Sequence, residues 1–423
     1  MKFGFVLIVL LIFCCCLEAF LLIKDNGIIA SLITSVRQMA RAKGWRAVIK
    51  PALSMIVGKI TDICNRKKKS VYGDGLIHIA FYPSGGLGDY VISARILEEL
   101  QTMCKCRITV FCERMEFGKA VYGSRDGVDL LPYDEFERSR NQYDLALLVE
   151  HFIHVKNWDK DRISILSPTL YKSIQYICDN WNSLYVHIQE QCFRERVQFE
   201  RCRALGLDRY TELCMGEAFI LSDKYVKIPM NDVYKEQFEE RNLNTRYITI
   251  NYGADAMRKG QKQLKMWPKE YYQKFIELIK GKITDIKIVQ LGGADAERIR
   301  GADSHILGES LELTKWILKN AECHIDCEGG LVHLATQLKT KCIVIFGPTP
   351  LHMYGYEQNV NLKSKKCSNC MGLHEDWAYK CYRTLESGEI PPMCMMDITP
   401  QRVCDICVEI LMSGDNVFNE EVS

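Results

Sequence analysis

Two glycine-rich turns in the sequence place titratable residues where a ligand could reach them. The first is Gly-Gly-Leu-Gly-Asp at residues 85–89, and the second is Glu-Gly-Gly-Leu-Val-His at residues 328–333. Glycines let a ligand approach the backbone, and the free amides at the start of a helix can hold a phosphate group. Asp89 and His333 could then act on that ligand. Each also has a structural alternative, because Asp89 can cap its helix and a lone histidine in such a turn is usually structural.

The first turn lies between elements that would position it at one edge of a sheet. We predict a helix at residues 90–104 and strands at residues 76–82, 107–112 and 144–149. The order β-α-β predicts a parallel sheet flanked by helices. Ligands bind beyond the carboxyl ends of such strands, which is where residues 85–89 would lie.

The same pattern returns after a polar segment at residues 222–245. The predicted strands are 247–252, 286–291, 323–326 and 342–346, and the predicted helices are 269–280, 311–320 and 331–338. The second glycine-rich turn again follows a strand and opens a helix. The sequence therefore predicts an α/β protein with two such units in tandem.

Several short segments occur together in a fixed order in the second unit. They are Lys-Met-Trp-Pro at 265–268, an acidic-x-Gly-x-x-His-Leu-Ala segment at 328–335, Phe-Gly-Pro-Thr at 346–349 and Cys-Met-Met-Asp-Ile-Thr-Pro at 394–400. In this order the sequence resembles the family-9 glycosyltransferases, the bacterial heptosyltransferase-like group. The turn at 85–89 resembles the Gly-Asp turn of that family. The resemblance covers about residues 75 to 412.

The resemblance implies the GT-B architecture, in which two Rossmann-like domains face a cleft, with the acceptor on the N-terminal side and the nucleotide sugar on the C-terminal side. Members of the family act by inversion without a metal. Asp89 corresponds to the general base, which would take the acceptor hydroxyl proton as that hydroxyl attacks the anomeric carbon. Fixed positive groups would stabilise the departing diphosphate. Many members have Asp in place of Glu328 and Thr in place of Gly329, so the donor does not follow from the motifs.

The candidate site residues fall into two sets by position. On the acceptor side they are the turn residues Gly85, Gly86 and Gly88, with Asp89 as the catalytic residue. On the donor side they are Lys265, Glu328, Gly329, Gly330, His333, Gly347 and Thr349.

Four cysteines near the C-terminus could bind a structural zinc ion. They are Cys367, Cys370, Cys381 and Cys394. Only the first two have the close spacing of a zinc knuckle, so we expect no cofactor and keep a structural zinc as an open alternative. The 20 cysteines of this large chain also occur inside apolar runs, which favours a reducing compartment over a disulfide scaffold.

The N-terminus carries a membrane signal. Residues 3–23 are apolar except for Glu18. A helix of this length, at about 1.5 Å per residue, crosses a hydrocarbon core of about 30 Å. Residues 24–70 hold eleven Lys and Arg against two acidic residues. The positive-inside rule then predicts a single-pass protein of the cytoplasmic membrane with its catalytic domains on the cytoplasmic side. A cleaved signal peptide is the alternative.

The charge of the whole chain excludes one class of partner. Lys plus Arg is 55 and Asp plus Glu is 53, so no global basic field favours nucleic acid. The predicted parts are a membrane anchor at 1–23, a basic helical segment at 24–72, an acceptor domain at 73–240, a nucleotide-sugar domain at 241–412 with a Cys-rich excursion at 367–394, and a tail at 413–423.

These observations favour a membrane-anchored, inverting, metal-independent glycosyltransferase that builds a cell-surface glycan. Its partners would be a nucleotide-sugar donor, which could carry a heptose-like sugar, a glycan or glycolipid acceptor, and the membrane. Two alternatives remain open. One is a nucleotide-sugar epimerase of the same shape. The other is a non-catalytic, membrane-tethered binding protein or zinc scaffold that retains the fold.

Overall fold

The computed structural model describes residues 73–188, 194–219, 225–243, 245–253, 263–374, 376–383 and 391–413. Residues 69–423 form one compact unit. Within the described ranges no helix is long and apolar enough to cross a membrane. The predicted anchor and the basic segment lie outside the described residues.

The N-terminal lobe is built on a five-stranded sheet. Its strands are β1 (Ile77–Pro83), β2 (Cys106–Cys112), β3 (Val128–Pro132), β4 (Leu145–Val149) and β5 (Ile153–Trp158). The order across the sheet is β3-β2-β1-β4-β5, and all neighbours are parallel except β5, which runs antiparallel to β4. The chain leaves β1 toward β2 and returns on the other side at β4. The carboxyl ends of β1 and β4 therefore flank the switch point of the sheet, where ligands bind in open α/β folds.

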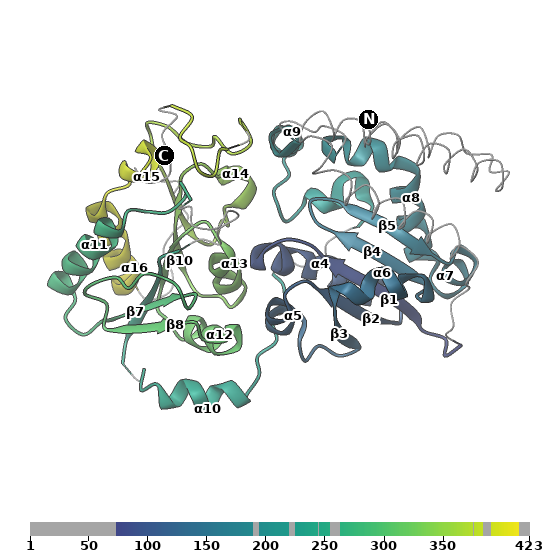
Figure 1. Cartoon of the computed structure of the whole chain (residues 1–423), viewed down its shortest axis with the longest axis horizontal. Helices are drawn as coiled ribbons and strands as arrows, with labels where there is room; N and C mark the ends of the chain where they lie inside the picture. The colour runs from purple at the N-terminus through teal and green to yellow at the C-terminus, as the bar shows by residue number, and fades with distance from the viewer. Residues whose placement is uncertain are drawn as a thin grey trace, which may run out of the picture. The chain divides into compact units, whose positions relative to one another are not determined.

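Helices pack around this sheet and lead to the second lobe (Figure 1). They are α4 (Leu87–Met103), α5 (Met115–Tyr122), α6 (Phe136–Ser139), α7 (Lys160–Leu166), α8 (Pro168–Leu184), α9 (Arg194–Leu205) and α10 (Val233–Glu240). The helix predicted at 90–104 begins three residues earlier, at Leu87, because Gly86 is its N-cap. Asp89 is therefore in the first turn of α4 and not at its cap.

The C-terminal lobe contains a six-stranded parallel sheet. Its strands are β6 (Tyr247–Asn251), β7 (Lys287–Gly292), β8 (Ser304–Leu307), β9 (His324–Cys327), β10 (Cys342–Phe346) and β11 (Val360–Lys363). Its helices are α11 (Lys269–Lys282), α12 (Leu311–Lys319), α13 (Gly330–Gln337), α14 (Leu351–Tyr354), α15 (Met393–Met396) and α16 (Pro400–Ser413). The order β11-β10-β9-β6-β7-β8 puts the switch point between β6 and β9. The second glycine-rich turn follows β9 directly.

The two predicted α/β units are confirmed, with additional strands at the edges. Edge strand β5 has the sequence IHVKNW. Because polar residues interrupt it, it lacks the continuous apolar run that is typical of a buried parallel strand. Edge strands β8 and β11 have four residues each, too few to show a period. Sequence patterning found the central strands because they are buried on both faces.

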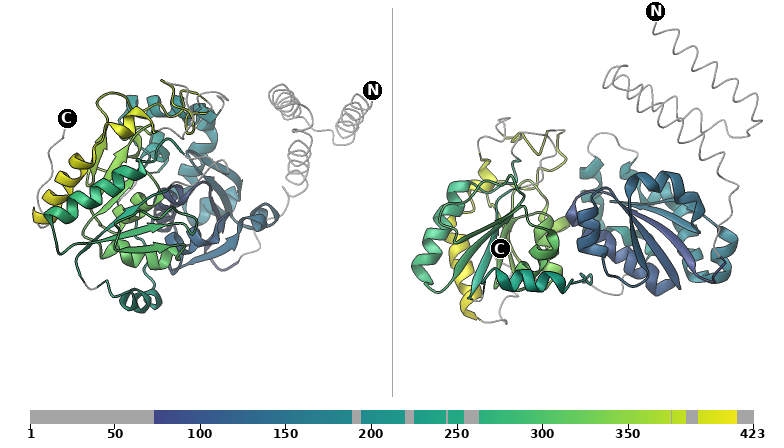
Figure 2. Two further views of the ribbon diagram at one scale, coloured as in Figure 1. Left: turned by 60° about the vertical axis from the view of Figure 1, so that its left-hand side comes forward. Right: turned by 60° about the horizontal axis from the view of Figure 1, so that its bottom comes forward.

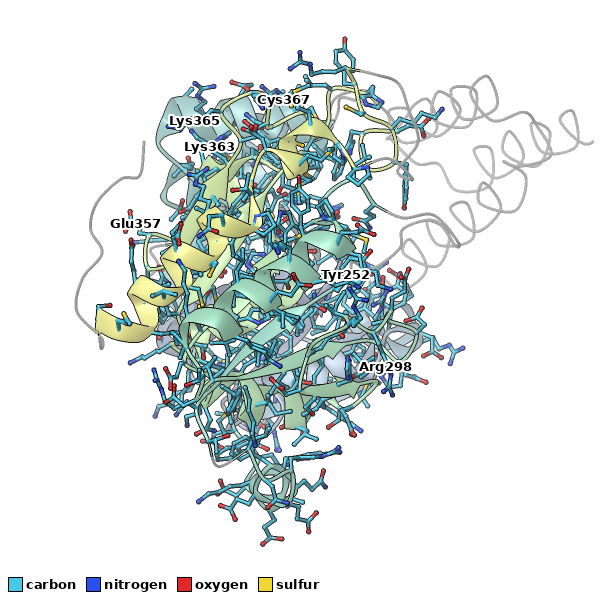
Figure 3. The ribbon with its side chains drawn as sticks, turned by 90° about the vertical axis from the view of Figure 1, so that its left-hand side faces the viewer. Tyr252, Arg298, Glu357, Lys363, Lys365 and Cys367 are labelled. Carbon is cyan, nitrogen blue, oxygen red and sulfur yellow. The ribbon has the colours of Figure 1, made fainter. Side chains whose placement is uncertain are left out.

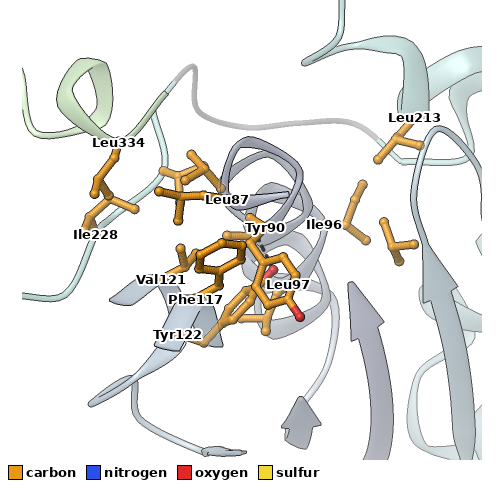
Figure 4. Packing of buried hydrophobic residues seen from close by; sticks show 14 of the residues in the cluster. Leu87, Tyr90, Ile96, Leu97, Phe117, Val121, Tyr122, Leu213, Ile228 and Leu334 are labelled. Atoms are coloured by element: carbon orange, nitrogen blue, oxygen red, sulfur yellow. Dashed lines mark hydrogen bonds between the residues drawn. The ribbon is translucent and has the colours of Figure 1, made fainter. Parts of the chain in front are cut away.

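One apolar core continues from the N-terminal lobe into the C-terminal lobe. It joins Leu87 and Val121 to Leu334 and to Ile228 of the connecting segment (Figure 4). The first turn of α4 lies against α13, and the views of Figures 1 and 2 agree on this contact. The two glycine-rich turns therefore face each other across the lobes.

Candidate active site

A cavity of about 970 Å³ lies between the two lobes, at the switch points of both sheets. Its wall includes the turn after β1, the residues after β4, the end of β6 and the turn after β9. We call it the interlobe cavity. Cavities of this size accommodate ligands the size of a nucleotide or a drug molecule.

Asp89 lies on the wall of the interlobe cavity with both carboxylate oxygens engaged. Its Oδ2 accepts a hydrogen bond from the Gly86 amide at 2.9 Å, and its Oδ1 accepts one from the Arg209 guanidinium at 2.8 Å. The Asp89 side chain remains 29% exposed. Burial raises the pKa of Asp89, but the charges of Arg209 and His151 outweigh it and hold this pKa below its ordinary value. Asp89 is therefore ionised and available to a ligand.

Arg209 connects Asp89 to a second buried carboxylate. Arg209 and Glu212 are fully buried, and the two side chains form an ion pair. Glu212 Oε1 also contacts His151 Nδ1 at 2.8 Å, and its Oε2 accepts a hydrogen bond from Gln198 at 2.8 Å. Burial raises the pKa of Glu212, while His151 and Arg209 lower it below its ordinary value. The result is a continuous charged network from Asp89 to His151.

Lys265 enters the same cavity from the C-terminal lobe. Its position is fixed by Trp267, which is fully buried and donates a hydrogen bond from its indole to the Ile398 carbonyl at 2.8 Å. This hydrogen bond connects the Lys-Met-Trp-Pro motif at 265–268 to the motif at 394–400. Lys265 Nζ lies 3.7 Å from Glu328 Oε2, and its side chain is 21% exposed. This long ion pair leaves the ammonium group accessible to an anion.

His333 is largely buried between the lobes. Its Nδ1 is 2.6 Å from the Tyr356 hydroxyl, and its Nε2 is 3.6 Å from Glu328 Oε1. The side chain is 5% exposed. Burial raises the pKa of Glu328, but Lys265 and His333 bring it below its ordinary value. His333 therefore helps to hold Glu328 and presents only a small edge to the cavity.

Two glycines allow the turns to approach each other. A Cβ at Gly88 would lie 2.5 Å from the His333 ring, and a Cβ at Gly330 would lie 2.8 Å from Leu87 Cβ. Gly85 has a φ of +112°, and its Cβ would collide with the Asp89 carboxylate. These glycines are required by the packing of α4 against α13 as well as by access for a ligand.

We expect Gly330→Ala to lower the free energy of unfolding by about 1–3 kcal/mol, because the new methyl group overpacks the contact with Leu87. Gly329→Ala is the matched control. Gly329 has an extended backbone, and the nearest atom to an added Cβ is 3.7 Å away. Urea unfolding of the three proteins measures both effects. Equal stability of the two variants would show that the lobes do not depend on this contact.

Thr349 and Gly347, the remaining candidates on the donor side, have different positions relative to the interlobe cavity. Thr349 lies on the cavity wall, and its buried hydroxyl has no hydrogen-bond partner among the residues that the structure describes. Gly347 is not on that wall: a Cβ there would lie 2.3 Å from Met395 Sδ. Thr349 is therefore available to a ligand, while Gly347 makes room for the segment that precedes α16.

The four C-terminal thiols lie near one another. The pKa of Cys394 is raised to about 12, first by burial and then by the neighbouring Cys367, Cys370 and Cys381. Burial and two of the same thiols raise the pKa of Cys370 to about 11. Figure 3 places Cys367 with Lys363 and Lys365 at one end of the lobe, away from Tyr252. Across the described residues, no group of three or more His, Cys, Asp or Glu has the arrangement of a metal site.

No motif or spacing in the sequence points to His151, Arg209 or Glu212. His151 follows β4 in the short segment before β5, and Arg209 and Glu212 lie in a polar stretch after α9 that resembles an ordinary loop. The topology of the sheet places the ends of β1 and β4 side by side, which brings His151 to the same edge as Asp89. Arg209 reaches Asp89 from the stretch after α9.

Comparison with known protein families identifies the domain to which residues 220–383 belong. The model of glycosyltransferase family 9 (heptosyltransferase) matches residues 220–383. This segment is a family 9 glycosyltransferase domain. The match confirms the resemblance seen in the sequence, and it makes the protein a glycosyltransferase. A comparison with curated protein sequences found no match.

Two solved structures of E. coli glycosyltransferases are similar in fold to this chain. TibC from enterotoxigenic E. coli H10407, an iron-containing dodecameric glycosyltransferase, is 14% identical with a TM-score of 0.53, over 80% of this chain and 79% of its own. E. coli ADP-heptose LPS heptosyltransferase II is 13% identical with a TM-score of 0.49, over 80% of this chain and 100% of its own. The likeness to TibC shows a shared fold, so the α/β architecture is the GT-B-like one.

Proposed function

We propose that this protein transfers a sugar from a nucleotide sugar to a hydroxyl of a glycan or lipid-linked acceptor, with inversion and without a catalytic metal. The proposal rests on one observation: Asp89 of the N-terminal lobe and Lys265 of the C-terminal lobe line the same cavity. An ionised carboxylate and an accessible ammonium group are the two charges that such a transfer needs, one for the incoming hydroxyl and one for the departing diphosphate.

The proposed reaction is a single displacement at the anomeric carbon. Asp89 takes the proton of the acceptor hydroxyl while its oxygen attacks. The bond from the anomeric carbon to the diphosphate breaks, and the electron pair leaves with the diphosphate. Lys265, the buried Thr349 hydroxyl and the first amides of α13 would stabilise the charge on the leaving group. One displacement inverts the configuration of the sugar.

ADP-D-β-D-heptose is the first donor to test, because TibC has been solved in complex with it. A thermal-shift screen of the full-length protein against a panel of nucleotide sugars selects the donor. A ligand at about 100 times its Kd stabilises the folded state by about 2.7 kcal/mol. Stabilisation by a nucleotide sugar, and not by the free sugar, supports the proposal, and no response to any nucleotide favours a non-catalytic scaffold.

An acceptor-free reaction distinguishes the epimerase alternative. An epimerase converts the donor into its epimer without any acceptor, whereas a transferase leaves the donor sugar unchanged until a hydroxyl attacks it. If the donor is epimerised in the absence of acceptor, the protein is a nucleotide-sugar epimerase and not a glycosyltransferase.

The four thiols are the candidate for a structural metal. TibC is iron-containing, and this chain brings Cys367, Cys370 and Cys381 close enough to Cys394 to affect its ionisation. Elemental analysis of the purified protein for zinc and iron tests this. One metal ion per chain, lost when Cys394 is replaced by Ser, would establish the site, and metal-free protein would leave a packed thiol cluster.

We also propose that residues 1–23 anchor the protein in the cytoplasmic membrane, with the catalytic lobes on the cytoplasmic side. The full-length protein should sediment with membranes and be released by detergent but not by 1 M salt, because apolar insertion is insensitive to ionic strength whereas a basic segment alone is screened. Release by salt would contradict the anchor. Digestion of the lobes by protease added outside intact cells would contradict the orientation.

A further inference from the structure

One end of the interlobe cavity lies between helix α9 of the N-terminal lobe and the Cys-rich excursion of the C-terminal lobe. The Trp377 indole donates a hydrogen bond to Glu195 Oε2 at 3.1 Å, and Arg196 Nη1 donates one to the Asn369 carbonyl at 3.0 Å. These bonds hold the excursion against the first turns of α9. Glu195, Gln198 and Trp377 all line the cavity, and we call the wall that they form the α9 end.

Gln198 contributes an unused hydrogen-bond acceptor to the α9 end. Its Nε2 donates to Glu212 Oε2 at 2.8 Å. An ionised carboxylate only accepts hydrogen bonds, so this contact fixes which end of the amide carries the oxygen. Gln198 is 1% exposed, and its Oε1 has no hydrogen-bond partner among the residues that the structure describes. Because a buried acceptor without a donor is unfavourable, we expect a ligand to supply the donor.

The charge of the α9 end is negative. Among the described residues that line the cavity, Arg114 and Lys265 are the Lys and Arg side chains. Arg114 follows β2, on the far side of β1 from β4, and its guanidinium lies over the Phe117 ring. Lys265 is paired with Glu328. An anionic group at the α9 end would therefore meet the Glu195 carboxylate without either cation, whereas hydroxyl and ammonium donors match its acceptors.

Aromatic side chains add apolar surface to this part of the cavity. Phe152 and Trp377 line the cavity from the two lobes, and Tyr354 lies edge-to-face with Phe199, with ring centroids 6.0 Å apart. Sites for small molecules combine such surface with a few polar groups that fix the orientation of the ligand. A sugar ring has the complementary surface, because its C–H groups can contact the aromatic rings while its polar substituents donate hydrogen bonds.

The α9 end is connected to the residue that we assign as the base. Gln198 donates to Glu212, Glu212 forms an ion pair with Arg209, and Arg209 donates to Asp89. We propose that the α9 end binds a sugar residue of the acceptor, and that this residue is an amino sugar or a neutral sugar and not an acidic one. The inference rests on the proposed function and names the class of acceptor.

The test measures Kd by calorimetric titration of the full-length protein at low ionic strength. The probes are methyl glucoside, methyl glucosaminide and methyl glucuronide, which share one ring and differ in charge, with the same three types in the galacto and manno series. We expect the best amino sugar to bind about tenfold or more tightly than the acidic sugar of its series, with the neutral sugar between them. An acidic sugar that binds as tightly as its amino counterpart, or no binding by any probe, would overturn the inference.

Glu195→Gln assigns this preference to the α9 end. The variant keeps an oxygen for the Trp377 indole and removes the charge, so the preference for the amino sugar should fall to about twofold or less. Glu200→Gln is the matched control on the same helix. Glu200 pairs with Arg196, is 46% exposed and does not line the cavity, so its variant should keep the wild-type preference. Equal preferences in the two variants would place the amino sugar elsewhere.

Gln198→Met tests the unused acceptor. It removes Oε1, so the neutral and the amino sugar should both bind about fivefold or more weakly, and unchanged stabilisation by a nucleotide sugar shows that the fold is intact. Unchanged sugar binding would remove Gln198 from the site. Failure of the inference and failure of the proposed function are distinguishable. A protein that binds a nucleotide sugar but prefers acidic sugars overturns the inference alone, whereas one that binds amino sugars and no nucleotide sugar overturns the proposed transfer.

Discussion

Asp89→Asn should reduce sugar transfer by roughly 10²–10⁴-fold and leave donor binding unchanged. In the wild type, Asp89 accepts a hydrogen bond from the Gly86 amide. The side-chain oxygen of Asn can accept the same bond, so the first turn of α4 stays capped. Arg209 retains its ion pair with Glu212. The variant loses the ability to take a proton, one negative charge and the hydrogen bond from Arg209. Initial rates of transfer and a donor titration measure the two quantities.

The control for this substitution is Asp159→Asn. Asp159 caps α7 by accepting a hydrogen bond from the Arg162 amide at 3.0 Å, and it does not line the interlobe cavity. The same chemical change there should leave transfer at the level of the wild type. Asp89→Asn with more than about a tenth of the activity would mean that Asp89 only stabilises the first turn of α4, through its hydrogen bond with the Gly86 amide, and that the base lies elsewhere.

Lys265→Met should weaken donor binding by about ten- to a hundredfold. A charge-assisted hydrogen bond is worth roughly 1.5–3 kcal/mol, and Lys265 is the cation we assign to the diphosphate. The loss has a second source: Glu328, which lies 3.7 Å from Lys265, would be left with an uncompensated charge facing the phosphate groups. Calorimetric titration with the donor measures the change in Kd.

Two variants separate these sources. Glu328→Gln added to Lys265→Met should recover part of the lost affinity, because it removes the repulsion. Lys274→Met is the control, since Lys274 pairs with Glu277 on the surface of α11 and is 59% exposed. Donor binding that is equal in Lys265→Met and Lys274→Met would remove Lys265 from the donor site.

The sequence predicted the central elements because buried parallel strands have continuous apolar runs, as in β1, β6 and β10. It also placed the two glycine-rich turns correctly at the carboxyl ends of β1 and β9. It could not find Arg209, because the hydrogen bond between Arg209 and Asp89 joins residues 120 positions apart. Glu212 enters the site only through its ion pair with Arg209. The spacing of residues in the motifs also could not show that Gly88 and Gly330 allow the two lobes to pack closely.

The most direct measurement is ³¹P NMR of the full-length protein with ADP-D-β-D-heptose, before and after addition of a glycolipid extract, with the product anomer assigned by ¹H NMR. We expect the donor to remain unchanged alone. On addition of the extract, the signals of ADP should appear in step with a sugar of inverted configuration on the lipid. A donor that is epimerised without release of ADP, or that stays unchanged with every nucleotide sugar and acceptor tried, would contradict the account.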